Sequence, residues 1–426
     1  MANWVIEKKG ALKGEIDVPP DKSISHRAVI LSSIAQGKSR VKNWLRADDV
    51  MRTIRAFQEL GVEIKINNEL IISGEGKHGL KPPQNPLDMG NSGTGLRLLA
   101  GVLAGQKFLT IITGDETLKK RPMRRIIEPL SKMGAKIEAE DGEHPPLRIQ
   151  GGDLKGIKYT LPVASAQVKS AILLASLYAT GKTKITEPAP SRDHTERMLE
   201  FFGARIKKSA LCIEMDCGQD LEAREIEVVG DISSASFFLV AGCLVKGSEV
   251  LVKNVGINPT RAGILEVLKE MGADIKLLNQ RNIAGEPVAD ILVKSSPLRA
   301  VEIKGEIIPR LIDEIPVLAV AGAVAQGTTI IRDAKELRVK ESDRIHSTVS
   351  ELKKMGAKIE ELEDGMIIEG PCELKGAEVY SHKDHRVAMS LAVAGLYAQG
   401  KTIIKEVQWV ETSFPDFFNK LNQLVA

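Results

Sequence analysis

The chain has 426 residues, of which 43% are hydrophobic and 27% are charged, a composition that is typical of a globular protein and excludes a disordered one. Its 59 Lys and Arg against 56 Asp and Glu leave a net charge of only +3, so we expect no nucleic-acid partner. No apolar run approaches the ~18 residues that a membrane helix needs, so we expect no membrane partner. The absence of an apolar leader segment and the four scattered cysteines favour a cytoplasmic protein.

Taken in chain order, the predicted elements repeat. Six Ala-rich apolar helices each end near a glycine that a short strand follows, at Gly37, Gly105, Gly181, Gly247, Gly327 and Gly400. A second helix–glycine–strand series alternates with the first in five copies, at Gly61, Gly134, Gly203, Gly272 and Gly356. We expect each glycine to end its helix in a left-handed conformation. The six units predict two lobes of three units each.

The sixth unit lacks its last strands. Residues 1–19 carry a strand pattern without a helix, so we expect them to complete it. This predicts one lobe over residues 20–227 and a second, discontinuous lobe over residues 1–19 and 228–426.

A polar segment precedes each Ala-rich helix. The six segments are Asp21–Arg27, Gly90–Arg97, Ala164–Ser170, Gly230–Ser236, Ile312–Pro316 and Lys383–Met389. Helix N-termini carry a partial positive charge, and Arg and Lys bind phosphate and carboxylate groups. Because equivalent positions of a repeat lie on equivalent faces, we expect these segments to line a cleft for a multiply anionic small ligand. Plain N-capping is the preferred interpretation for Ser233–Ser236 only.

Two further motifs carry charge. Arg338–Arg344 (RVKESDR) alternates acids and bases before a helix, a pattern that suits proton transfer beside an anion. Basic residues also lie on both sides of Pro122. Among them, we interpret Lys119, Lys120 and Arg125 as part of a solvated surface.

Two attractive patterns do not indicate the sites they mimic. Gly395–Thr402 matches the P-loop spacing, but the pattern predicts a helix before it and a strand after it, the reverse of a P-loop. His382, Asp384 and His385 have metal-like spacing without a further ligand cluster nearby, so we expect no metal site.

Together the motifs resemble one family. EPSP synthases (3-phosphoshikimate 1-carboxyvinyltransferases) are similar over about Val18–Phe418, in the segments DKSISHR, GNSGTGLR, KKRPM, ASAQVKS, SRDHTERML, RVKESDR, KDHR and SFPDFF. The wording of ASAQVKS and SRDHTERML resembles the class II branch. The resemblance implies an α/β fold of two lobes, each an inside-out α/β barrel of three βαβαββ repeats. It also implies a monomer that needs neither a metal nor an organic cofactor.

The implied reaction belongs to the shikimate pathway, which leads through chorismate to the aromatic amino acids. The carboxyvinyl (enolpyruvyl) group of phosphoenolpyruvate is transferred to the 5-hydroxyl of shikimate 3-phosphate through a tetrahedral intermediate, and phosphate is released. Addition to the enol carbon needs an acid for the methylene and a base for the hydroxyl.

The resemblance also implies roles for individual residues. Shikimate 3-phosphate would be bound by Ser23, Arg27, Ser165, Ala166, Gln167, Arg192, Asp313 and Lys340. Phosphoenolpyruvate would be bound by Lys22, Asn91, Gly93, Arg121, Gln167, Arg344, His385 and Arg386. The catalytic residues would be Lys22, Asp313 as proton acceptor at the 5-hydroxyl, Lys340 assisting it, and Glu341 in proton transfer at the methylene.

Two positions concern variation within the family. The segment Glu411–Pro415 lacks the Lys that other branches carry before the terminal T-F-P motif. Gly93 stands where glyphosate-tolerant class II enzymes can have Ala, so we expect glyphosate to inhibit this protein.

Two alternatives stay open on the residues. UDP-N-acetylglucosamine enolpyruvyl transferase shares the fold and the donor, but it typically has an early Lys–Asn pair and a loop Cys, whereas Ser23 follows Lys22 here. A non-catalytic binder of phosphate ligands or RNA ends explains the cations but not Asp313 and Glu341 among them.

Overall fold

The computed structural model describes residues 2–8 and 10–424. The chain divides into two compact units: unit 1 comprises Met1–Pro19, Gly230–Arg281 and Pro287–Ala426, and unit 2 comprises Pro20–Val229 and Asn282–Glu286. The assignment of Asn282–Glu286 to unit 2 is a feature that the sequence pattern does not indicate. Residues 1, 9, 425 and 426, which the predicted second lobe includes, lie outside the described residues.

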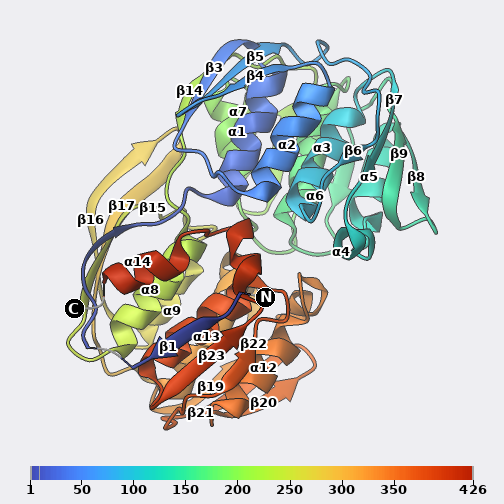
Figure 1. The fold of residues 1–426 in the computed structure, drawn as a ribbon. Coiled ribbons are helices and arrows are strands. Elements are labelled where there is room, and N and C mark those ends of the chain that lie inside the picture. The colour runs from blue at the N-terminus through green and yellow to red at the C-terminus, as the bar shows by residue number, and fades with distance from the viewer. Residues whose placement is uncertain (1, 9, 425–426) are drawn as a thin grey trace. The chain divides into compact units, whose positions relative to one another are not determined.

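Unit 2 carries three sheets around its helices (Figure 1). The helices are α1 (Lys22–Ile34), α2 (Asp48–Glu59), α3 (Gly93–Leu103), α4 (Glu116–Lys119), α5 (Arg124–Met133), α6 (Ala166–Ser176) and α7 (His194–Phe201). The strands are β3 (Gln36–Lys42), β4 (Glu63–Ile66), β5 (Leu70–Glu75), β6 (Leu87–Asp88), β7 (Leu109–Thr113), β8 (Lys136–Glu140), β9 (His144–Gln150), β10 (Lys158–Thr160), β11 (Lys182–Thr186), β12 (Ile206–Ser209), β13 (Cys212–Asp216) and β14 (Glu225–Glu227). The three strand orders are β14-β3-β5-β4, β6-β7-β9-β8 and β10-β11-β13-β12.

Unit 1 has the same plan. Its helices are α8 (Ile232–Leu244), α9 (Gly263–Glu270), α10 (Ile308–Leu311), α11 (Ile315–Val324), α12 (Arg344–Lys354), α13 (His385–Tyr397) and α14 (Phe417–Gln423). Its strands are β1 (Trp4–Glu7), β2 (Lys13–Asp17), β15 (Glu249–Gly256), β16 (Asp274–Ile283), β17 (Glu286–Lys294), β18 (Glu302–Ile303), β19 (Gly327–Ile331), β20 (Lys358–Leu362), β21 (Gly365–Gly370), β22 (Glu378–Tyr380) and β23 (Lys401–Lys405), where the turn between β16 and β17 groups with unit 2. Their orders are β16-β17-β15-β2, β18-β19-β21-β20 and β1-β23-β22.

The six sheets share one pattern of pairing. In each sheet the strand that follows an Ala-rich helix pairs in parallel with one neighbour and antiparallel with the other, as β11 does with β10 and β13. The N-terminal segment supplies two of these partners: β1 pairs antiparallel with β23, and β2 pairs in parallel with β15. The predicted sixfold repeat is therefore confirmed. The predicted completion of the last unit by residues 1–19 is correct for β1 only, because β2 joins the sheet of β15 instead.

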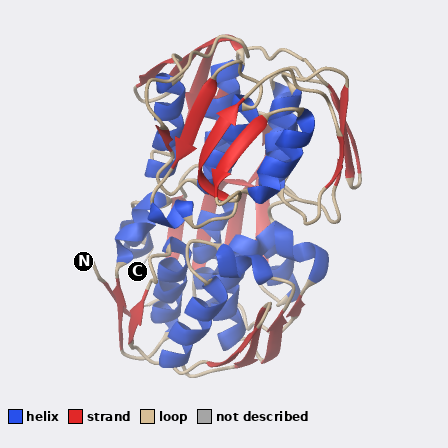
Figure 2. Ribbon diagram, turned by 90° about the vertical axis from the view of Figure 1, so that its right-hand side faces the viewer, coloured by secondary structure: helices blue, strands red, loops and turns tan. Residues whose placement is uncertain are grey.

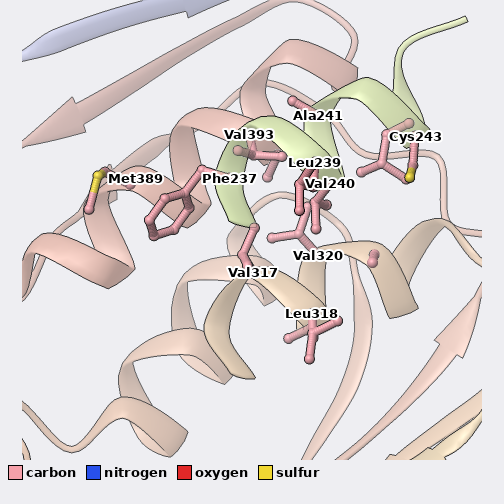
Figure 3. Packing of buried hydrophobic residues seen from close by; sticks show 14 of the residues in the cluster. Phe237, Leu239, Val240, Ala241, Cys243, Val317, Leu318, Val320, Met389 and Val393 are labelled. Carbon is pink, nitrogen blue, oxygen red and sulfur yellow. The ribbon is translucent and has the colours of Figure 1, made fainter. Parts of the chain in front are cut away.

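Helices fill the interior of each unit and strands lie at its periphery (Figure 2). In unit 1 this interior is formed by α8, α11 and α13, whose residues are buried almost all round. Figure 3 shows Phe237 and Val240 of α8 beside Val317 of α11 and Val393 of α13. A helix that is apolar on every face is one that neighbours surround, which explains the Ala-rich runs of the sequence.

The glycines of the second series end their helices as expected. Gly61, Gly134, Gly203, Gly272 and Gly356 all have positive φ. Around Gly61, the amide of Val62 donates to the carbonyl of Phe57 and that of Gly61 to Gln58, which is a Schellman motif. The other four glycines repeat the same pair of hydrogen bonds.

For the first series the expectation holds only in part. Five of the six glycines, all but Gly105, have positive φ. They do not cap their helices, however: α1, for example, ends at Ile34, Ala35 is already extended, and Gly37 lies within β3. Gly105 has no positive φ, and a Cβ there would lie 2.1 Å from Tyr178 Cγ. These glycines lie at the start of a strand, or where a side chain packs closely against the backbone, rather than at a helix cap.

Candidate active site

All six predicted polar segments begin a helix, as the sequence pattern predicts. The N-cap side chains of Asp21, Ser92, Ser165, Asp231 and Asp384 accept hydrogen bonds from the first-turn amides. The capping interpretation of Ser233–Ser236 is wrong in detail, because Asp231 caps α8 and the Ser233 hydroxyl instead contacts Glu314 and Arg261. In each unit the segments form one polar cluster, and the two clusters are described separately.

In unit 2, the first turn of α1 carries two of the predicted cations. Lys22 Nζ lies 3.0 Å from Asp49 Oδ2, and both side chains are mostly buried. Arg27 is 3% exposed and donates to the Ser23 carbonyl at 2.9 Å and to Thr195 Oγ1 at 2.7 Å. Burial lowers the pKa of Arg27 to about 10, so it still carries its positive charge at neutral pH.

Other polar residues of the same segment have a structural role. His26 is fully buried, and its Nδ1 lies 2.8 Å from Thr53 Oγ1. Burial lowers the pKa of His26 to about 3, so the ring is neutral. Ser25 Oγ accepts a hydrogen bond from the Leu45 amide at 3.0 Å. Both side chains hold α1 against its neighbours.

The start of α3 lies beside a further arginine. Arg121 Nη2 donates to Asn91 Oδ1 at 2.7 Å, and Asn91 Nδ2 in turn donates to Asp115, the N-cap of α4, at 3.1 Å. A Cβ on Gly93 would lie 3.1 Å from Arg121 Nη1 and 3.3 Å from Arg97 Nη1. The absence of a side chain at Gly93 therefore leaves two guanidinium groups room beside the helix N-terminus.

The start of α6 joins this group. Gln167 Oε1 accepts from Arg97 Nη1 at 2.6 Å, and Gln167 Nε2 donates to Thr94 Oγ1 at 2.9 Å. Ser165 is the N-cap and Ala166 the first residue of α6. The predicted residues of unit 2 on α1, α3 and α6 thus all lie at helix N-termini, while Arg121 follows α4 and the half-buried Arg192 precedes α7.

In unit 1, one guanidinium organises the cluster. Arg344 is 1% exposed and donates to three carboxylates: Asp384 at 2.8 Å, Asp313 at 3.0 Å and Glu341 at 2.6 Å. Burial alone would lower the pKa of Arg344, but the three carboxylates outweigh it and raise that pKa above its usual range. Burial would also raise the pKa of Asp384, yet the charge of Arg344 holds it below its ordinary value.

Two more predicted cations face Asp313. Lys340 Nζ lies 3.7 Å and Arg386 Nε 4.0 Å from Asp313 Oδ1. His385 is buried at the first position of α13. The structure therefore brings the predicted residues of unit 1 together, and Asp313 has three cationic groups within 4.0 Å of its carboxylate.

Some charged residues of the same motifs lie outside the cluster. Arg338 donates to Asp343, Glu361 and the backbone of the β20–β21 turn, and His346 Nδ1 lies 3.0 Å from Glu361. His382 Nε2 lies 2.7 Å from Glu351, whereas Asp384 binds Arg344. Within residues 2–8 and 10–424, no group of three His, Cys, Asp or Glu could hold a metal.

The rejection of a P-loop at Gly395–Thr402 is confirmed. Gly395 lies in α13, and Lys401 begins β23, so a helix precedes the glycine-containing turn and a strand follows it. A phosphate-binding P-loop needs the opposite order.

Sequence reasoning missed four residues that hold site residues in place. Arg97 binds Gln167, Asp49 binds Lys22, and the buried carboxylate of Glu314 binds Arg261 and lies 3.8 Å from Arg386. Lys169 forms a buried network that is described below. Arg97 follows Gly93 by one helical turn, and this spacing could have indicated that it shares the face of Gly93.

The comparisons with known proteins agree over the whole chain. The family model of EPSP synthase (3-phosphoshikimate 1-carboxyvinyltransferase) matches residues 6–421. The chain belongs to the EPSP synthase family. A 3-phosphoshikimate 1-carboxyvinyltransferase of Thermodesulfovibrio yellowstonii is 53% identical over 427 residues, 99% of each chain. Its counterpart in a Thermoanaerobacter species is 55% identical over 420 residues, 98% of this chain and 99% of the relative.

A solved structure supports the family at the level of the fold. The EPSP synthase of Acinetobacter baumannii matches with a TM-score of 0.89 and 46% sequence identity, over 99% of this chain and 98% of the other. The predicted α/β fold of the EPSP synthase family is thereby confirmed. Within the described residues, no helix is both long and apolar enough to cross a membrane.

Proposed function

We propose that this chain is an enzyme that transfers the carboxyvinyl group of phosphoenolpyruvate to the 5-hydroxyl of shikimate 3-phosphate, giving EPSP and phosphate. The geometry of Arg344 carries this proposal. It binds both Asp313 and Glu341, the two carboxylates that the acid and base steps of the reaction need. A protein that only binds anions has no use for two carboxylates among its cations.

We infer that both clusters contribute residues to the binding of each substrate. We assign shikimate 3-phosphate to Ser23, Arg27, Ser165, Ala166, Gln167, Arg192, Asp313 and Lys340, with Arg192 on its phosphate. We assign phosphoenolpyruvate to Lys22, Asn91, Gly93, Arg121, Gln167, Arg344, His385 and Arg386. Both substrates are anions, so cations and helix N-termini stabilise them and bring the reacting atoms together.

The proton steps follow from the carboxylates. In the proposed reaction, Asp313 accepts the proton of the 5-hydroxyl, and the hydroxyl oxygen bonds to the enol carbon. Glu341, in its protonated form, gives its proton to the methylene, which completes the tetrahedral intermediate. Glu341 then takes a proton from the new methyl group as the carbon–oxygen bond to phosphate breaks. Lys340 lies 3.7 Å from Asp313 and assists its proton transfer.

Narrower features belong to the same proposal. The segments ASAQVKS and SRDHTERML favour the class II branch, and the substrates are small molecules. We propose a cytoplasmic monomer that uses no metal or organic cofactor. The full-length match to the EPSP synthase model favours this acceptor over UDP-N-acetylglucosamine and favours catalysis over simple binding.

Phosphate release tests the function. The protein is mixed with shikimate 3-phosphate and phosphoenolpyruvate, and each substrate is omitted in turn. We expect phosphate only when both are present, with EPSP identified by mass. Absence of release with both substrates would contradict the proposal, and the missing Lys in Glu411–Pro415 would then be the first position to restore.

A further inference from the structure

Unit 2 contains a buried lysine to which the proposed reaction gives no role. Lys169 lies on α6, two residues after Gln167, and is 1% exposed. Its Nζ lies 2.8 Å from a carboxylate oxygen of Glu187 and 2.8 Å from one of Glu196. It also donates to the backbone carbonyl of Ser191 at 3.3 Å. A charge this deeply buried is retained only where partners compensate its lost hydration.

The charges of this network depend on one another. Burial would lower the pKa of Lys169, but Glu196 and Glu187 raise it above its ordinary value. Burial raises the pKa of Glu196, and Lys169 opposes that rise. Glu196 also raises the pKa of Arg27 against the effect of burial. Two cations and two carboxylates thus stabilise each other in the interior of unit 2.

The network holds both ends of a short segment, Ser191–Glu196. At the first end, Lys169 binds the Ser191 carbonyl, while the Ser191 hydroxyl donates to Glu187. At the other end, Lys169 binds Glu196, in the first turn of α7. Between these two ends lie Arg192 and Thr195, and the Thr195 hydroxyl accepts a hydrogen bond from Arg27. Lys169 therefore binds both ends of a segment that carries Arg192, one proposed ligand of shikimate 3-phosphate, and that positions Arg27, a second one.

We propose that Lys169 is a positioning residue for shikimate 3-phosphate, which acts by fixing the segment Ser191–Glu196. This inference rests on the proposed function. Without the ammonium group, Glu187 and Glu196 are left buried without their shared cation, and the segment that carries Arg192 shifts. Arg121, which is proposed for phosphoenolpyruvate alone, is held by Asn91, and Asn91 in turn binds Asp115, so we expect that substrate to be affected far less.

The test separates the two substrates in steady-state kinetics. Lys169→Met keeps most of the length of the side chain and removes its charge. We expect the KM for shikimate 3-phosphate to rise about tenfold or more while the KM for phosphoenolpyruvate stays within about twofold. Lys184→Met is the matched control: Lys184 lies on β11 of the same unit and pairs with Glu214, but both side chains are largely exposed, so we expect no change.

Glu187→Gln is a second variant with a smaller structural change, because it keeps the shape of the side chain and leaves Glu196 to bind Lys169. We expect the same selective rise, at about threefold, in the KM for shikimate 3-phosphate. If Lys169→Met does not fold by circular dichroism, this variant decides. A folded variant with unchanged kinetics, or an equal rise in both KM values, would overturn the proposal.

Calorimetry with shikimate 3-phosphate alone distinguishes a failure of the proposed function from a failure of the positioning role of Lys169. A wild-type protein that binds this ligand but releases no phosphate would contradict the proposed function only. Weaker binding by Lys169→Met would then still support the positioning role, and equal binding would contradict it.

Discussion

At the scale of single residues, the position of Arg344 explains why the sequence alone does not assign separate proton-transfer roles to Asp313 and Glu341. RVKESDR and the distant Ile312–Pro316 indicate acids and bases, but no pattern shows that Asp313 and Glu341 share one guanidinium. The motifs identify the predicted residues one by one. Lys169 and Glu314 lie within the polar segments Ala164–Ser170 and Ile312–Pro316, and Asp49 lies outside them. Nothing local shows that these three side chains are buried partners, because burial depends on the tertiary packing.

Glu341→Gln tests the proposed role at the methylene. Gln keeps an oxygen that Arg344 can donate to, but it neither takes nor gives the proton of the reaction. We expect kcat to fall about 100-fold or more while calorimetry shows nearly unchanged binding of both substrates. Turnover close to that of the wild type would exclude Glu341 from proton transfer.

Gly93→Ala tests the space beside Arg121. The new Cβ would lie 3.1 Å from Arg121 Nη1, so the guanidinium must move by a few tenths of an ångström. We expect glyphosate inhibition of the wild type at millimolar inhibitor, a weaker inhibition of the variant, and a KM for phosphoenolpyruvate that rises about threefold. A wild-type rate that millimolar glyphosate leaves unchanged would contradict the first expectation, and identical inhibition curves the second.

His26 links the stability of the protein to pH. Its pKa is about 3 in the folded protein and near the ordinary histidine value of 6.5 in the unfolded chain, so the unfolded state binds the proton more readily. Between these values the contribution of this residue to the unfolding free energy falls by about 1.4 kcal/mol for each unit by which the pH falls. We expect His26→Gln, which keeps a partner for Thr53, to show a shallower loss of stability between pH 6 and pH 4 in denaturant titrations. Parallel slopes in the two proteins would show that His26 does not contribute.

At the scale of elements, the apolar Ala-rich runs predict α8, α11 and α13 well, because these helices are buried on nearly every face. The expectation that a left-handed glycine ends each helix is correct for the five Schellman motifs, where helix, turn and strand are local in sequence. It fails for Gly37 and Gly105, because the first series of helices ends in extended backbone or in a turn crowded by Tyr178. Such crowding arises from residues distant in sequence and has no local signal.

The cost of a Schellman glycine can be measured at Gly203. Its φ is +102°, and the nearest atom to an added Cβ is 3.8 Å away, so Gly203→Ala strains only the backbone. We expect a loss of about 1–2 kcal/mol in unfolding free energy. Gly152→Ala is the control, because this glycine has no positive φ and no atom within 4 Å of an added Cβ. Equal midpoints of denaturant unfolding for the two variants would contradict the strain argument.

At the scale of the whole molecule, unit 2 is nearly continuous in sequence and contains all the strands of its three sheets. We therefore expect a fragment of residues 20–229 to unfold cooperatively. It should be less stable than unit 2 of the full chain, because it lacks Glu286, which lies 2.8 Å from the buried His194 Nδ1. Thermal unfolding followed by circular dichroism checks this, and a broad, non-cooperative transition would contradict it.

Unit 1 differs in one respect that matters while the protein is being made. Trp4 of β1 pairs with Ile404 of β23, and β2 pairs with β15. A ribosome completes the strands of unit 2 first, and domains generally fold as units in the order of synthesis. β1, which carries the buried Ile6, must instead wait without its partner until almost the whole chain has emerged. Unit 1 therefore reaches its native structure only after β23 has emerged, and the nascent chain must keep an apolar strand from pairing elsewhere until then.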